Sequence, residues 1–251
     1  MMSPIPRPGA FDEMISEYGL SLEQNELDGL GKYLALLLDA NTRMNLTAIR
    51  DPDDAWVKHI FDALTLIPVL SELGEGATIV DIGSGGGIPG LPLAITMPGV
   101  SFTLVDATKK KTDFLRDAAE ALGLTNVNVI CGRAEALGQD RGVKTPDGRE
   151  GGTREAFDGA IARAVGRMAM LAELTIPLVK VGGLTVMTKG QKADEELGEA
   201  KQALHMLHTN HVGTVDTPTG RIVVLEKQRT TPRDYPRRDG EPKRSPLGVG
   251  N

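Results

Sequence analysis

Two carboxylates flank a glycine-rich turn in the first half of the chain. Asp81 lies near the end of the apolar run 78–82, the turn Gly83–Gly90 follows, and Asp106 ends the next apolar run, residues 100–106. Glycines in such a turn permit unusual dihedral angles and let a ligand approach bare backbone. A nucleotide-like ligand at the strand ends would place its ribose hydroxyls against Asp106. The spacing therefore predicts a site for such a ligand.

The charge beside the turn indicates which ligand fits. Gly85, Gly87 and Gly90 match the G-x-G-x-x-G dinucleotide pattern, which alone is a weak signal. Asp81, however, lies two residues before the first glycine, where it would repel a pyrophosphate. S-adenosylmethionine carries an ammonium, a sulfonium and no phosphate, so it suits this anion. We expect an S-adenosylmethionine site here, with a glycine-rich turn of an ordinary βαβ unit as the alternative.

Composition limits the class of protein. The chain has 251 residues, 40% of them hydrophobic, enough for one large α/β core or two small ones. No apolar run approaches the roughly 20 residues of a membrane helix, and Met1–Gly9 lacks the apolar region of a secretory signal. The single cysteine, Cys131, cannot form an internal disulfide, which suits a reducing compartment. We therefore expect a cytoplasmic protein without a membrane segment.

Charge is distributed unevenly along the chain. The formal net charge is −6, yet residues 221–251 hold eight basic and four acidic residues. An acidic body with a basic C-terminal end indicates a polyanionic partner on one side.

The elements that must position these residues alternate between strand and helix. Strands are predicted near 77–82, 100–106, 126–131, 157–162, 183–188, 212–217 and 220–227, with helices in most intervals. This alternation implies an α/β fold with a mostly parallel, doubly wound sheet, and Pro218-Thr219-Gly220 joins the last two strands as an antiparallel pair. Residues 138–155 are polar and rich in glycine, so we expect a mobile loop, as a surface insertion rather than a binding arm.

Before the sheet the pattern is helical. Ser21-Leu22-Glu23-Gln24 resembles a capping box, and Asp51-Pro52-Asp53-Asp54 is typical of a helix start. The expected organisation is a flexible N-terminus over 1–20, a helical extension over 21–73, a sheet-bearing core over 74–228 and a basic tail over 229–251.

Several motifs in a fixed order resemble one family. They are Met44–Ile49, His59 with Asp62, the Asp81–Gly90 turn, Arg133-Ala134-Glu135, Phe157–Ala164, Lys189-Gly190 and Tyr235-Pro236-Arg237-Arg238. Over about residues 20–247 the chain resembles the bacterial small-subunit rRNA guanine-N7 methyltransferases, the glucose-inhibited division protein B family. Ala63, Thr188 and the length of the 138–155 segment depart from the usual pattern, which bears on substrate contacts.

The resemblance implies a class I S-adenosylmethionine-dependent methyltransferase fold, Rossmann-like with a seven-stranded sheet. It implies transfer of a methyl group to N7 of a guanine in the 530 loop of 16S rRNA. The expected partner is 16S rRNA or a small ribosomal subunit particle, and the expected state is a monomer.

The residue chemistry agrees with methylation at N7. Guanine N7 has a free lone pair and no proton, so the reaction needs in-line approach to the donor and no general base. The chain offers no obvious acid–base pair. It has no Asn/Asp-Pro-Pro-aromatic run after strand 157–162, and no Pro-Cys nucleophile, because Ile130 precedes Cys131.

Candidate residues follow from these positions. Asn45, His59 and Asp62 are the candidate catalytic residues and would line the guanine pocket. Alternatively, Asn45 caps a helix, and His59 and Asp62, at i and i+3, form a structural pair. Arg163 ends a strand at the carboxyl edge of the sheet, where α/β ligands bind. The expected donor-binding residues are Asp81, Gly83, Ser84, Gly85, Gly87, Ile88, Asp106, Ala134, Glu135 and Arg163.

The C-terminal basic residues are candidates for RNA contact. Extended arginines suit RNA phosphates and Tyr235 could stack on an unpaired base, whereas a solvated tail is the alternative. The expected RNA-binding residues are Lys189, Arg221, Arg233, Tyr235, Arg237, Arg238 and Lys243. His205, His208 and His211 lack a carboxylate or cysteine that would complete a site, so no metal is expected.

Two other classes of function are compatible with the same features. One is a class I methyltransferase acting on a small molecule or a protein. The other is a non-catalytic RNA-binding module with a methyltransferase fold.

Overall fold

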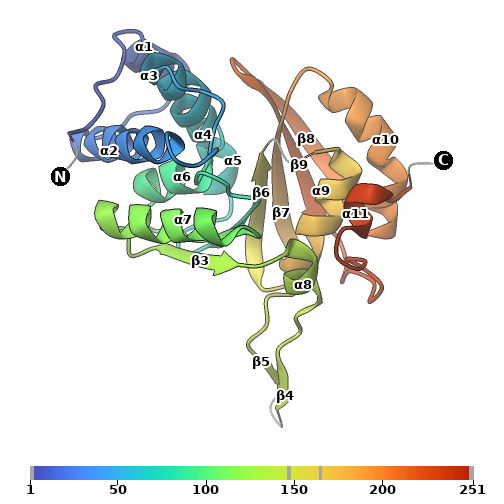
Figure 1. Ribbon diagram of the computed structural model, residues 1–251. Helices are drawn as coiled ribbons and strands as arrows, with labels where there is room; N and C mark the ends of the chain where they lie inside the picture. The colour runs from blue at the N-terminus through green and yellow to red at the C-terminus, as the bar shows by residue number, and fades with distance from the viewer. Residues whose placement is uncertain (1–2, 146–147, 164–165, 249–251) are drawn as a thin grey trace.

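A single mixed sheet organises the chain. The computed structural model describes residues 3–145, 148–163 and 166–248. Seven strands lie in the order β3-β2-β1-β6-β7-β9-β8 (Figure 1). Their bounds are β1 Thr78–Ile82, β2 Ser101–Asp106, β3 Val127–Cys131, β6 Phe157–Arg163, β7 Val179–Lys189, β8 Thr209–Thr217 and β9 Gly220–Lys227. All neighbours pair in parallel except β9, which is antiparallel to both β7 and β8. The predicted α/β fold is confirmed.

Both faces of the sheet are covered by helices, which is why its strands are apolar on both sides. Ile79 packs in one core cluster and its neighbour Val80 in the other, because successive side chains point to opposite faces. The first cluster lies under α6 (Gly90–Thr96), α7 (Lys109–Leu122) and the N-terminal helices. The second lies under α8 (Ala134–Gln139), α9 (Met168–Thr175), η2 (Ile176–Leu178) and α10 (Ala193–Met206).

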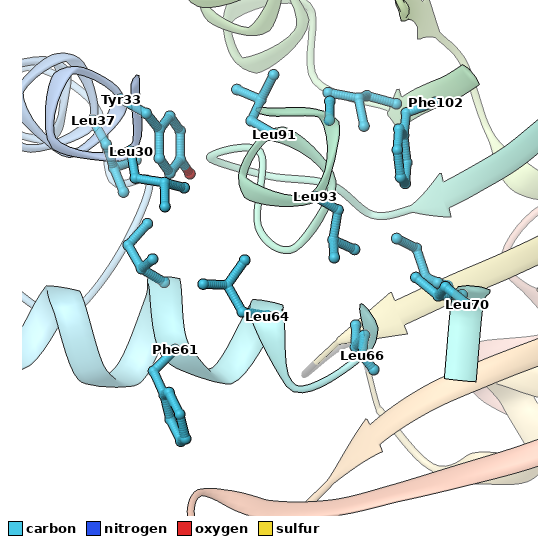
Figure 2. Close-up of a cluster of buried hydrophobic side chains, with 14 of the residues drawn as sticks. Leu30, Tyr33, Leu37, Phe61, Leu64, Leu66, Leu70, Leu91, Leu93 and Phe102 are labelled. Atoms are coloured by element: carbon cyan, nitrogen blue, oxygen red, sulfur yellow. The ribbon is translucent and has the colours of Figure 1, made fainter. Parts of the chain in front are cut away.

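The N-terminal helices pack on the first face. They are α1 (Phe11–Glu17), α2 (Gln24–Asn41), α3 (Pro52–Ala55), the π-helical turn η1 (Trp56–Phe61), α4 (Asp62–Leu64) and α5 (Ile67–Ser71). Figure 2 shows Leu30, Tyr33 and Leu37 of α2 facing Leu64 and Leu91, so this extension shares a core with the sheet. As predicted, Asp51 caps the helix that begins at Pro52: its side chain accepts a hydrogen bond from the Asp54 N–H at 2.9 Å.

Two predictions about the N-terminal region were wrong. Residues 3–20 are not a free end, because Phe11 is fully buried against Trp56, with ring centroids 4.7 Å apart, and the Ile5 N–H donates to the Gly31 carbonyl at 3.1 Å. The cap of α2 lies two residues later than expected, at Glu23, whose N–H donates to the Glu26 side chain at 2.6 Å.

The segment 138–155, which was predicted to be a mobile loop, contains secondary structure in its described residues. It holds a hairpin of β4 (Val143–Thr145) and β5 (Gly148–Glu150) that projects from the body (Figure 1). After the hairpin, the guanidinium of Arg154 donates to the carbonyls of Gly138, Thr231, Pro232 and Tyr235 at 2.6–3.1 Å. Backbone carbonyls fix this arginine, so it is structural.

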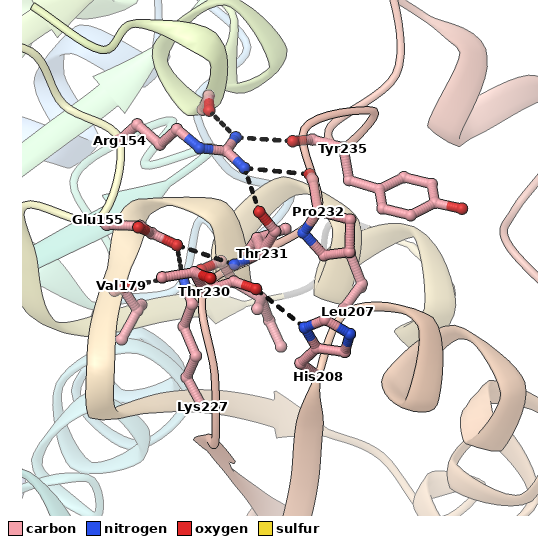
Figure 3. Close-up of polar contacts among 12 residues, drawn as sticks. Arg154, Glu155, Val179, Leu207, His208, Lys227, Thr230, Thr231, Pro232 and Tyr235 are labelled. Atoms are coloured by element: carbon pink, nitrogen blue, oxygen red, sulfur yellow. Dashed lines mark hydrogen bonds and ion pairs between the residues drawn. The ribbon is translucent and has the colours of Figure 1, made fainter.

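The C-terminal segment is packed against α8 and α9 rather than solvated. Figure 3 shows its start: Lys227, only 2% exposed, donates to Glu155 at 2.8 Å, and the Thr231 N–H donates to the same carboxylate at 2.9 Å. Further along lies the short helix α11 (Glu241–Arg244), and Leu247 is buried in the second core cluster. Polar contacts to buried partners and the buried side chain of Leu247 together hold the segment on the body. None of the helices in the described part of the chain is long and apolar enough to cross a membrane.

Candidate active site

The two predicted carboxylates lie at different depths. Asp81 is 1% exposed, beneath the turn, where its carboxylate accepts the Gly90 N–H at 3.2 Å. Burial raises the pKa of Asp81 to about 7, against the opposing effects of hydrogen bonds and the charge of Arg163. Asp106 is 8% exposed and accepts the N–H groups of Gly85 at 3.1 Å and Thr108 at 2.8 Å. A carboxylate has about four lone-pair sites, so Asp106 keeps acceptor capacity for a ligand.

The glycine turn follows a path that only small residues allow. Gly87 has φ of 93°, and a Cβ there would lie 2.5 Å from Leu91. A Cβ on Gly90 would collide with Leu104 and come within 2.8 Å of Asp81. Gly83 has φ of 75° and is exposed, so bare backbone faces outward as predicted.

Two residues of the turn that were predicted to bind S-adenosylmethionine, Ser84 and Ile88, make contacts within the protein. The Ser84 hydroxyl donates to the Asp81 carbonyl at 2.9 Å and accepts the Val105 N–H at 3.0 Å. Ser84 therefore links β1 to β2 through its hydroxyl, and the residue is only 2% exposed. Ile88 is half-buried and packs against the first core cluster.

A cavity of about 250 Å³ opens between the turn and the C-terminal segment. Gly83, Asp106 and Glu135 line it, and Met170 and Leu174 of α9 supply apolar surface. The complete lining is Ile82, Gly83, Val105, Asp106, Ala107, Gly132, Arg133, Ala134, Glu135, Met170, Leu174, Gly240 and Lys243. Apolar walls with a carboxylate that has free lone pairs fit a nucleoside, so the residues present fit the predicted donor.

A second cluster joins the N-terminal helices to the carboxyl edge of the sheet. Arg163, at the end of β6, pairs with Asp62 at 2.6 Å and donates to the Lys58 carbonyl at 2.5 Å. His59 lies 3.5 Å from the same guanidinium. Within the described structure, His59 and Asp62 are not bonded to each other as the i, i+3 spacing suggested. Arg163 is the group that brings them together.

His59 is neutral at physiological pH. Burial, with the nearby charge of Arg163, lowers its pKa to about 4. Its Nε2 is 2.7 Å from the Thr47 hydroxyl, which also accepts the Ile49 N–H at 3.0 Å. His59 thus holds the loop 42–50 against the helix.

Asn45 lies in that loop and caps no helix. It is exposed and lines a cavity of about 450 Å³ with Asn41, Arg43 and Arg50. The residue that organises the loop is Asn41, whose side chain bonds the backbone of Leu46 and Thr47 at 2.9–3.0 Å.

Several predicted RNA-binding residues have partners within the protein. Lys189 is buried and donates to Glu196 at 2.7 Å, and Arg221 pairs with Asp194 and Asp216. Arg237 pairs with Glu173, which is fully buried, at 2.7–3.2 Å. These three are structural, because their charges are already compensated. Arg233, Arg238 and Lys243 are exposed, and Tyr235 is half-buried against the second core cluster.

Sequence reasoning missed four side chains that hold the site. The Tyr33 hydroxyl donates to the Gly86 carbonyl at 2.8 Å, and the Thr219 hydroxyl donates to Asp62 at 2.5 Å. Glu173 and Asn41 are the others. A glutamate within the apolar helix of residues 168–175 was the available signal for Glu173. No group of three or more His, Cys, Asp or Glu residues capable of holding a metal lies in the described ranges.

Solved structures share the fold at low identity. A mutant of MtNAS superposes with a TM-score of 0.52 and 16% identity, covering 87% of this chain and 82% of that one. A mutein of the branched-chain polyamine synthase from Thermus thermophilus gives 0.53 and 14%, covering 80% and 64%. These likenesses show the α/β fold alone.

Sequence relatives are much closer. A protein of Sorangium cellulosum named ribosomal RNA small subunit methyltransferase G is 48% identical over 235 residues, 94% of each chain. Its namesake in Leuconostoc citreum is 38% identical, over 95% of this chain and 98% of that one. The family profile GidB, described as rRNA small subunit methyltransferase G, matches residues 26–222. The chain belongs to the rRNA small subunit methyltransferase G family.

Proposed function

We propose that this methyltransferase transfers a methyl group from S-adenosylmethionine to N7 of a guanine in the 530 loop of 16S rRNA. The observation that carries the proposal is the cavity bounded by Gly83 and Asp106, in a chain that belongs to this family. When bound, S-adenosylmethionine supplies an electrophilic methyl group on a sulfonium. Asp106 would hold the ribose, and the apolar side chains of Met170 and Leu174 would cover the adenine.

The electrostatics of the cluster formed by Arg163, Asp62 and His59 suit a reaction without proton transfer. Methylation leaves the guanine ring positively charged, so a neighbouring uncompensated cation would oppose it. The charge of Arg163 is balanced by Asp62 at 2.6 Å, and His59 is neutral because its pKa is about 4. With its ion pair intact, Arg163 can orient the O6 edge of a guanine while adding no net charge. His59 and Asp62 act here as positioning residues.

The loop that carries Asn45 supplies the other side of the proposed guanine site. Tyr33 fixes the turn from below, and Leu37 and Leu46 would contact a Cβ on Gly86, so loop 42–50 lies against the glycine turn. Asn45 is exposed there with Arg50, and its amide can bond the edge of a base.

Mapping methylated nucleotides tests the proposal. rRNA from cells with and without this chain is compared at single-nucleotide resolution; loss of one N7-methylguanine in the 530 loop is the expected result. Naked 16S rRNA and isolated small subunits are then offered to the purified protein with labelled donor. An unchanged rRNA pattern with methyl transfer to a small molecule or protein would favour the other enzyme class. Donor binding with no transfer would favour an RNA-binding module.

Two further expectations belong to this proposal. An rRNA substrate implies that the enzyme works in the bacterial cytoplasm. We infer that it acts as a monomer, which light scattering of the purified chain in the presence of donor checks.

A further inference from the structure

The C-terminal segment reaches the proposed donor cavity. Arg237 is fastened to the buried carboxylate of Glu173, and the Arg237 N–H donates to the same group at 2.8 Å. Three residues further, the Gly240 N–H donates to Glu135 at 3.0 Å. Asp239 lies 3.7 Å from Arg133. Residues 236–244 are therefore fixed to α8 and α9 at several points, and they end beside the cavity.

This segment closes one end of the cavity. The lining includes Gly240 and Lys243 together with Asp106 and Glu135. Asp106 ends β2, and residues 132–135 follow β3, the next strand outward. If Asp106 holds a ribose, the attached base lies over residues 132–135. The C-terminal segment contacts the same residues, through the hydrogen bond from Gly240 to Glu135. Gly240 has φ of 74°, so the chain turns sharply there and α11 begins with its backbone against Glu135.

The lining at this end is rich in acceptors. The carboxylates of Asp106 and Glu135 accept hydrogen bonds only, whereas adenine presents ring nitrogens that need a donor. Of the two cationic side chains in the lining, Arg133 faces Asp239. Lys243 is exposed, and its ammonium has three donors on a flexible stem.

We propose that Lys243 is a donor-binding residue and that residues 236–244 are the wall covering the adenine end of the donor cavity. This inference rests on the proposed function, because it takes the ligand to be S-adenosylmethionine. It assigns Lys243 to the donor rather than to RNA. It also makes the C-terminal segment part of the active site.

Calorimetric titration of two neighbouring variants tests the role of Lys243. Lys243→Ala and Arg244→Ala each remove one exposed cation of α11, but only Lys243 lines the cavity. S-adenosylmethionine, S-adenosylhomocysteine and 5′-methylthioadenosine, which lacks the amino-acid part, serve as probes. Lys243→Ala should weaken all three by the same factor of about three to ten, the range for the net loss of one hydrogen bond to solvent-accessible partners. Arg244→Ala should stay within about twofold.

The pattern across probes decides the outcome. An equal effect of the two substitutions, or a loss with S-adenosylmethionine but not with 5′-methylthioadenosine, would overturn the assignment to the adenine end. Lys243→Arg should restore part of the affinity. Failure of the unsubstituted protein to bind any probe would instead contradict the donor assignment of the proposed function.

Limited trypsin digestion tests the wall itself. The segment offers cleavage sites after Arg238, Lys243 and Arg244, all exposed. Saturating S-adenosylmethionine should slow cleavage after Lys243 in the full-length protein several-fold, with cleavage after Lys192, which is exposed and does not line the cavity, as the internal reference. Equal rates with and without donor would contradict the proposed wall.

Discussion

The ion pair with Asp62 holds Arg163 in position. Removing Asp62 should therefore lower the free energy of unfolding. Asp62 is 3% exposed, and it also accepts the Thr219 hydroxyl at 2.5 Å. Asp62→Ala leaves Arg163 without its counter-charge, so we expect a loss of about 3 kcal/mol in the free energy of unfolding. Chemical denaturation measures it. The matched control is Asp54→Ala, which removes an exposed ion pair with Lys58 on the preceding turn and should cost at most about 0.5 kcal/mol. Equal losses would mean that the buried pair is not what holds the site.

We expect Asp81 to make the affinity for S-adenosylmethionine depend on pH. Its pKa of about 7 in the folded chain means that the carboxyl is half-protonated near neutrality. A cationic ligand favours the ionised form, so binding should lower this pKa, release a proton, and tighten as the pH rises through about 7. Calorimetry at pH 7 in two buffers of different ionisation enthalpy measures the released proton. Asp81→Asn should remove both the release and the pH dependence; their persistence would assign the titration to another group.

His59 should leave turnover unaffected by pH. Its pKa of about 4 keeps the ring neutral at pH 6 and above. N7 requires no proton acceptor, so the turnover rate with saturating donor and rRNA should be nearly flat from pH 6 to 9. A steep dependence tied to one carboxylate would contradict methylation at N7.

At the scale of elements, the glycine turn joins β1 to α6, and its glycines differ in how much space surrounds them. Gly85 has φ of 55°, and a Cβ there would meet only the Gly83 carbonyl at 3.7 Å, whereas one on Gly90 would collide with Leu104. Gly85→Ala should therefore cost about 1–2 kcal/mol of stability from its left-handed backbone. Gly90→Ala should cost more, about 3 kcal/mol, since overpacking displaces the β2 side chain. Thermal denaturation of the two variants gives the order; the reverse order would show that Leu104 can move aside.

The strands were predictable because burial on both faces of the sheet leaves apolar runs such as residues 222–225 of β9, Ile-Val-Val-Leu. The antiparallel last pair followed from a local signal, Pro218-Thr219-Gly220. The hairpin of β4 and β5 could not be predicted from the sequence, because its polar residues show no strand periodicity. α1 was missed because Phe11 and Ile15 are too few to mark a helix without the partner surface formed by Trp56.

At the scale of the whole molecule, the sequence does not show which cationic side chains are paired within the protein, because that depends on long-range contacts. The turn and Asp106 were placed at the cavity by local pattern, but which cations remain free for RNA depends on partners distant in the chain. Arg237 and Glu173 are separated by 64 residues, and Arg221 and Asp194 by 27. The number of basic residues in a segment cannot distinguish such paired cations from exposed ones like Arg238. Within the described chain we therefore propose Arg233, Arg238 and the loop near Asn45 as the RNA-binding groups.

Adjacent arginines of the C-terminal segment should consequently behave differently. Arg237→Ala leaves Glu173 buried and unpaired, so it should lower the free energy of unfolding by about 3–5 kcal/mol and weaken donor binding with it. Arg238→Ala changes an exposed side chain and should alter stability by no more than about 0.5 kcal/mol. If Arg238 contacts a phosphate, its loss should reduce the slope of log affinity for rRNA against log salt by about 0.7. Titrations at four salt concentrations, with donor affinity measured in parallel, separate the two effects. An unchanged salt slope for Arg238→Ala would move the RNA contact to the loop that carries Asn45 and Arg50, because that loop lies against the glycine turn through Leu46.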